Sequence, residues 1–63
     1  MTHDDLQKVI NVLRVAANDY SLRAIEATRN RYTADAEILT ARAVDVIEAI
    51  ALLEELKLAD DLS

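Results

Sequence analysis

The chain contains neither glycine nor proline in its 63 residues. Tight hairpins and multi-strand folds rely on these two residues at their turns, because glycine tolerates positive φ and proline presets φ. The apolar 52% of the chain is mostly alanine, leucine, isoleucine and valine, interspersed with glutamate, aspartate and arginine. This composition favours long helices. The sequence therefore predicts an all-α fold in one domain, residues 1–63, with no separate linker.

Two positions have the pattern of a helix start. Thr2 stands three residues before Asp5, a spacing at which hydroxyl and carboxylate can satisfy free backbone N–H groups. Thr33 likewise precedes an acidic stretch, which suits the positive end of a helix dipole. We predict an antiparallel two-helix hairpin with helices at about residues 4–30 and 34–59, and fraying at residues 60–63. Because Asn18 and Asp19 disfavour a helix interior, three helices are the alternative.

Apolar residues recur at steps of three and four along both predicted helices. If the chain folds about residues 31–32, positions whose numbers sum to 63 face each other, and large residues such as Tyr20 meet small ones such as Ala43. The predicted hairpin core comprises Leu6, Ile10, Leu13, Ala17, Tyr20, Ala24, Leu39, Ala43, Val46, Ile50 and Leu53. Tyr32, at the turn, is either an exposed contact residue or a cap over the hairpin end.

Both helices carry further apolar residues outside these stripes. A two-helix hairpin buries one stripe per helix, so the remainder would form a larger patch than stable monomers usually expose. The chain also has no cysteine, so no disulfide can supplement its small core. We expect the surplus to be covered by dimerisation into a four-helix bundle. The predicted association surface comprises Val15, Leu22, Ile25, Ile38, Leu52 and Leu56.

The net charge of −5 is unevenly distributed. Residues 23–42 carry a net charge of +1 and the rest of the chain −6, so the terminal end of the hairpin is acidic. An antiparallel dimer would bring each turn near the acidic end of its partner, whereas a parallel dimer would place acid on acid. Nucleic acids and anionic membranes are poor partners for an acidic chain.

No residue pattern indicates catalysis. His3 lies beside Asp4 and Asp5, where a surface metal is conceivable, but an exposed residue in a capping turn is the preferred interpretation. Acidic pairs near the C-terminus have no nucleophile or histidine beside them in the sequence, which favours a solvated helix face. We predict no catalytic, cofactor-binding or metal-binding residue, and no enzyme activity.

The sequence has no apolar run long enough to span a membrane, and its first residues lack the pattern of a signal peptide. We therefore expect a cytoplasmic protein whose principal partner is a second copy of itself, acting as a protein–protein interaction module. One alternative is a small acidic inhibitor or adaptor that occludes a nucleic-acid-processing protein of a host. A third is an RNA-binding hairpin dimer that uses Asn11, Arg14, Asn18 and Arg29.

Overall fold

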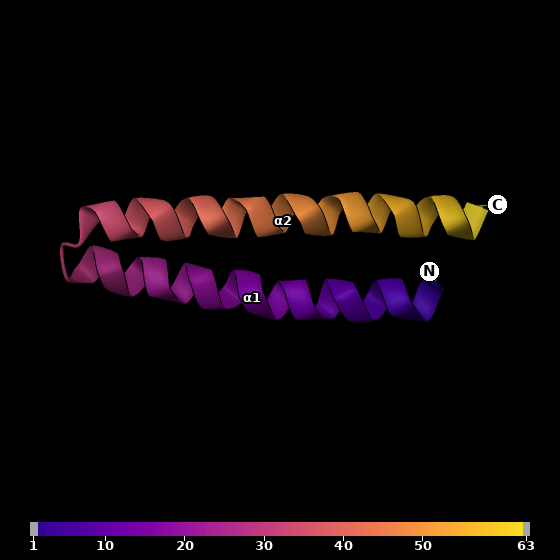
Figure 1. Cartoon of the computed structure of the whole chain (residues 1–63), viewed down its shortest axis with the longest axis horizontal. Helices are drawn as coiled ribbons and strands as arrows, with labels where there is room; N and C mark the ends of the chain where they lie inside the picture. The colour runs from indigo at the N-terminus through magenta and orange to yellow at the C-terminus, as the bar shows by residue number, and fades with distance from the viewer. Residues whose placement is uncertain (1, 63) are drawn as a thin grey trace.

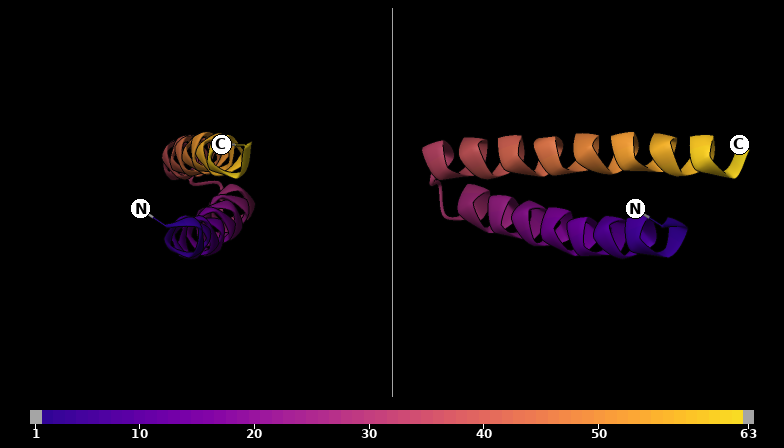
Figure 2. Two further views of the ribbon diagram at one scale, coloured as in Figure 1. Left: turned by 90° about the vertical axis from the view of Figure 1, so that its right-hand side faces the viewer. Right: turned by 45° about the vertical axis from the view of Figure 1, so that its right-hand side comes forward.

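The computed structural model describes residues 2–62, which form two helices that pack against each other in opposite directions (Figure 1). Helix α1 spans His3–Arg29 and helix α2 spans Thr33–Leu62. No strand occurs in the described part of the chain. The expected all-α architecture with two packed helices is confirmed. The two helices stay side by side in every view, and α2 extends past the start of α1 (Figures 1 and 2).

Helix α1 begins with the predicted capping arrangement. The Thr2 hydroxyl accepts a hydrogen bond from the Asp5 backbone N–H at 3.2 Å, and the Asp5 carboxylate accepts one from the Thr2 N–H at 3.4 Å. This reciprocal pair satisfies two N–H groups that have no partner inside the helix. Asp4 and Asp5 also place negative charge at the positive end of the helix dipole.

The three-helix alternative is wrong, because α1 continues through Asn18 and Asp19. Two neighbouring contacts offset the poor helix propensity of these residues. Ala17 is buried against α2, and the Asp19 carboxylate lies 3.0 Å from Arg23 Nε one turn later. Packing and an i,i+4 ion pair therefore outweigh a weak local preference.

The turn between the helices is a Schellman motif without glycine. The Tyr32 N–H donates to the Ala27 carbonyl at 2.8 Å, and the Arg31 N–H donates to the Thr28 carbonyl at 3.1 Å. Arg31 has φ of 63°, the left-handed conformation that glycine usually supplies after a helix C-terminus. The motif closes the last turn of α1 at the cost of placing a β-carbon in a crowded conformation.

The start of α2 lies one residue earlier than predicted. The Tyr32 carbonyl accepts the Ala36 N–H at 2.9 Å, so Tyr32 occupies the N-cap position and Thr33 is already helical. Tyr32 thus both ends the turn of α1 and begins α2, because its N–H and its C=O bond in opposite directions.

The prediction that residues 60–62 fray is also wrong, since α2 remains helical to Leu62; Ser63 lies outside the described residues. The last turn is tied to α1 by His3, whose Nε2 lies 2.7 Å from Asp61 Oδ1. Nε2 itself is hidden from solvent, although the imidazole as a whole is partly exposed.

The register of the hairpin is visible in its cross-helix contacts. His3 meets Asp61, and the Lys57 ammonium donates to the Gln7 side chain. The residue numbers in both pairs sum to 64, one more than the predicted 63. The Arg14–Glu54 pair sums to 68, because two long side chains reach each other about one helical turn along the hairpin.

The core between the helices changes character along its length. Among the described residues, the buried apolar side chains near the open end are large and those toward the turn are alanines, as follows: Leu6, Ile10, Ala17, Ala24, Ala27 and Ala43. The other predicted core positions, Leu13, Tyr20, Leu39, Val46, Ile50 and Leu53, are only partly buried. A single layer of contact between two helices leaves each helix open on its remaining sides.

Candidate interaction surface

Large apolar side chains are extensively exposed on this hairpin. Those with more than a third of their surface in water are Val9, Val12, Val15, Leu22, Ile25, Tyr32, Ile38, Val44, Ile47, Leu52, Leu56, Leu58 and Leu62. By contrast, Leu6 and Ile10 are the large apolar side chains buried in the described part of the chain. Stable monomers seldom expose large contiguous apolar patches, so the grouping of these side chains on the surface decides what they can bind.

The elongated shape of the molecule also exposes more surface than a compact chain of this size would. The hairpin measures 49 × 14 × 12 Å, and its radius of gyration of 14.5 Å exceeds the value of about 11 Å for a compact chain of this length. Its solvent-accessible surface is 4853 Å². A compact protein of 7.0 kDa would expose about 4,000 Å². The hairpin therefore has an excess surface of about 800 Å².

One side of the hairpin is bridged by polar contacts and is called the ion-pair side below. Arg14 Nη2 lies 2.6 Å from Glu54 Oε1 across the two helices. Gln7, Lys57 and Asp61 line the same open cleft, together with Leu58. These polar groups already have partners within the chain, so the hydrogen bonds and ion pairs at the open end of this side are made within the hairpin.

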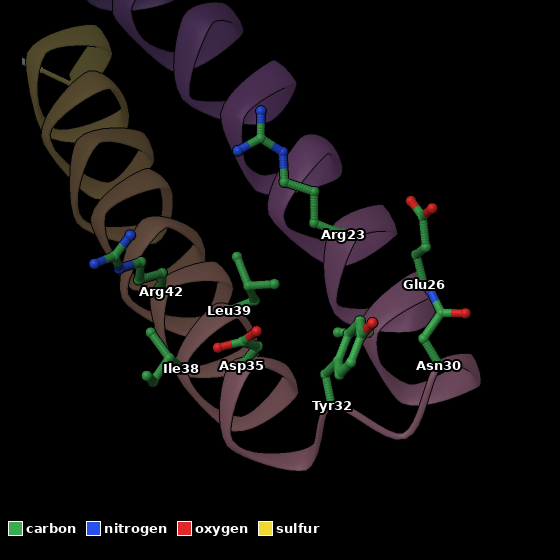
Figure 3. Close-up of a pocket in the computed structure, with 9 residues that line it drawn as sticks. Arg23, Glu26, Asn30, Tyr32, Asp35, Ile38, Leu39 and Arg42 are labelled. Atoms are coloured by element: carbon green, nitrogen blue, oxygen red, sulfur yellow. The ribbon is translucent and has the colours of Figure 1, made fainter.

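The opposite side carries an open cavity of about 460 Å³ at the turn end (Figure 3). Tyr32 stands between the two helix ends, with Arg23 on α1 and Arg42 on α2 further from the turn (Figure 3). Glu26 and Asp35 lie on its rim as well. Arg14 and Arg23 are nine residues apart, two and a half helical turns, so the two cavities open on opposite sides of α1.

Toward the termini, this second side becomes apolar. Val9 and Ala16 precede Arg23 by multiples of seven residues, and Ala49 and Leu56 follow Arg42 in the same way. Residues spaced seven apart lie on nearly the same side of a packed helix. Val12 and Leu52 adjoin them at steps of three and four. We call this set the apolar seam, and it comprises Val9, Val12, Ala16, Ala49, Leu52 and Leu56.

The six residues predicted to form the association surface are all exposed in the single chain. They do not share one side of the hairpin. Leu52 and Leu56 belong to the apolar seam, and Ile38 lines the cavity on the same side. Ile25 instead lines a depression with Ser21 and Thr40 on the other side, and Val15 and Leu22 lie on the outer face of α1. Their involvement in association stays a prediction.

Four seam residues, Val9, Val12, Ala16 and Ala49, are absent from the predicted association surface. Val9 has 37% of its surface exposed and Val12 has 68%. The spacing of seven residues between Val9, Ala16 and Arg23 places Val9 on the same side of α1 as Arg23. Only the hairpin register shows that the apolar residues of both helices lie on one side of the molecule.

The residues that suggested RNA binding are partly occupied by internal contacts. Arg14 pairs with Glu54, and the Asn11 side chain accepts a hydrogen bond from Gln7 at 2.9 Å. Within residues 2–62, no group of three or more histidine, cysteine, aspartate or glutamate side chains is arranged to hold a metal ion. Neither described helix combines the length and the apolar character needed to cross a membrane.

Comparison with models of known protein families, with curated protein sequences and with solved structures finds no match to this chain.

Proposed function

We propose that this protein is a non-enzymatic assembly module that associates with itself through the apolar helix surface left open by the hairpin. The observation that carries the proposal is the contrast, within residues 2–62, between two fully buried large apolar side chains and thirteen exposed ones. Burial of apolar surface is the main favourable term in both folding and association. A second helical layer would bury most of the apolar surface that a two-helix hairpin with so thin a core leaves in water.

The polar surface supports association without catalysis. Among residues 2–62 no polar or charged residue is buried as a whole, and the buried residues of the core are all apolar. The Arg14–Glu54 ion pair between the helices is also at the surface, where both side chains remain about half exposed. Acid–base catalysis at neutral pH commonly depends on burial or a close charge partner inside a pocket. An assembled bundle would instead display its charged outer faces to other molecules.

The test is the solution mass of the purified chain, measured by light scattering on a sizing column over a hundredfold range of concentration. We expect a dimer or a tetramer that dissociates on dilution, with a melting temperature that rises with concentration. A helical monomer at every concentration would reject self-association and leave the apolar surface to a different protein.

A further inference from the structure

Both helices present exposed apolar residues on the apolar seam. Val9 and Val12 of α1 and Leu52 and Leu56 of α2 are all exposed there. The other side also carries exposed Ile25 and Leu58, but there they accompany a charged pair, Arg14 and Glu54. Covering that side would remove a charged pair from water, which is costly, whereas covering the seam removes mainly hydrocarbon.

Residues of the seam are spaced about a common centre. Val9 and Ala16 lie on either side of Val12, and Ala49 and Leu56 lie on either side of Leu52. The midpoints of the two pairs fall half a residue beyond Val12 and Leu52, whose numbers sum to 64 as in the His3–Asp61 and Gln7–Lys57 contacts, so the two midpoints lie within about one residue of the same height in the hairpin. A single twofold axis can therefore pass through both.

We propose that the apolar seam joins two copies of the chain in an antiparallel dimer, with the two turns at opposite ends. In this arrangement each helix faces the same helix of the other copy. Val9 lies over the partner's Ala16, and Leu56 lies over the partner's Ala49. Each large residue then faces a small one, as interdigitating helices require. This inference rests on the proposed self-association and specifies its face and its orientation.

A parallel dimer through the same side would pack less well. Each helix would face the other helix of its partner at equal height. Val9 would then meet the partner's Leu56, and Ala16 would meet the partner's Ala49. Large residues would collide while small ones left a void, and both defects destabilise an interface core.

Charge gives the parallel arrangement a second penalty. At equal heights, Arg23 would face the partner's Arg42, and Asp19 would face the partner's Asp45. Like charges opposed across an interface repel, and the twofold axis would repeat each pair.

In the antiparallel dimer the arginines meet acids. Arg23 comes within about one helical turn of the partner's Asp5, and Arg42 within one turn of the partner's Asp60. Asp45 also approaches the partner's Asp60, and Arg42, three residues before Asp45, offsets that repulsion. The turn end of each hairpin thus complements the acidic end of the other.

The available area is sufficient for this dimer. Overlap of residues 3–23 of α1 with the same residues of the partner extends over about 32 Å. The excess surface of the single hairpin, about 800 Å², equals the area that each partner buries in a protein interface of standard size.

Cysteine cross-linking tests the orientation directly, because the natural chain has no cysteine. The variants are Val12→Cys and Leu52→Cys, with Val15→Cys as a matched control of equal exposure on the outer face of α1. Each is incubated alone in a glutathione redox buffer at a concentration where the wild type is dimeric, and the disulfide-linked fraction is measured by non-reducing electrophoresis.

We expect Val12→Cys and Leu52→Cys each to link to itself at least tenfold more than Val15→Cys, because both positions lie at the twofold axis. Linkage only when Val12→Cys and Leu52→Cys are mixed would indicate the parallel dimer and overturn the proposal. If neither Val12→Cys nor Leu52→Cys forms a disulfide while both variants keep the mass of the wild-type dimer, the interface lies on another face and the proposal is overturned. A monomeric wild type would instead reject the proposed function itself, so the two failures are distinguishable.

Discussion

Replacement of Leu52 by aspartate tests the apolar seam by its effect on assembly. The Leu52 side chain is 63% exposed in the single chain, so the hairpin itself gains little from it. Full burial of a leucine contributes about 1.5–3 kcal/mol, and covering the exposed part contributes about 1–2 kcal/mol. The twofold axis doubles this to about 2–4 kcal/mol, before any cost of burying the new carboxylate. We expect the dissociation constant of the Leu52→Asp dimer to rise about 30-fold to 700-fold.

Leu58→Asp is the matched control for this substitution. Leu58 is 62% exposed, nearly the same as Leu52, but it lies on the ion-pair side. It is closer to the C-terminal end of α2 and next to acidic residues, so a new aspartate there disfavours the helix more than at position 52. A larger loss of assembly in Leu52→Asp therefore cannot come from helix propensity.

Sedimentation equilibrium gives the dissociation constants of both variants, and circular dichroism at equal concentration reports their helix content. Equal dissociation constants for Leu52→Asp and Leu58→Asp would refute the assignment of the interface to the seam. A weaker dimer for Leu58→Asp would move the interface to the ion-pair side.

Three further changes test the fold and the proposed charge pairing. Arg31→Gly should raise the free energy of unfolding by about 0.5–1 kcal/mol, because glycine adopts the positive φ without the steric cost of a β-carbon. Arg31→Ala, which removes the charge but keeps the β-carbon, should give no gain, and urea denaturation of both variants separates the two effects. Ile10→Ala should lower that free energy by about 2–4 kcal/mol because Ile10 is 1% exposed, and Val15→Ala, at a 71% exposed site, should change it by less than about 0.5 kcal/mol in the same urea titration. Arg42→Glu should weaken an antiparallel dimer about 3-fold to 30-fold at low salt, and stronger association in sedimentation would contradict the arrangement, because a parallel dimer would gain an attraction to Arg23.

The helices were predictable because local chemistry and tertiary packing agree along most of the chain. Thr2 and Asp5 have the sequence spacing of a capping box, and the structure contains both of its hydrogen bonds. Asn18 and Asp19 suggested a break because their weak helix propensity is a local property. The burial of Ala17 is a tertiary property, and no pattern within the first helix alone reveals it.

The ends of the helices were less predictable for a related reason. A left-handed residue after a helix is usually glycine or asparagine, so Arg31 gave no signal, although Asn30 lies beside it. The last turn of α2 contacts His3, which lies at the other end of the sequence. Contacts of this range follow from the register of the hairpin.

The surplus of apolar surface was evident in the sequence, but its division between sides was not. A helical wheel for either helix alone shows apolar residues off the main stripe without saying which of them meet. The register places Val12 and Leu52 at one height, and the cavity that holds Arg23 and Arg42 shows which flanks of the two helices share a side. This information assigns Leu52 and Leu56 to the apolar seam and places Val15, Leu22 and Ile25 on other sides of the hairpin.

The same register explains why the seam lies near the termini. Toward the turn, Ala24, Ala27 and Ala43 are buried and let the helices approach closely, which closes that half of the hairpin with little hydrocarbon. Toward the open end, Leu6 and Ile10 are buried, and the seam flanks them with more apolar surface than the hairpin can cover. The Schellman turn and the buried alanines therefore hold the two helices together at the turn, while the open half leaves the seam uncovered. In the proposed dimer, folding and assembly would be coupled, because the residues that join the two copies would also shield the core of each hairpin.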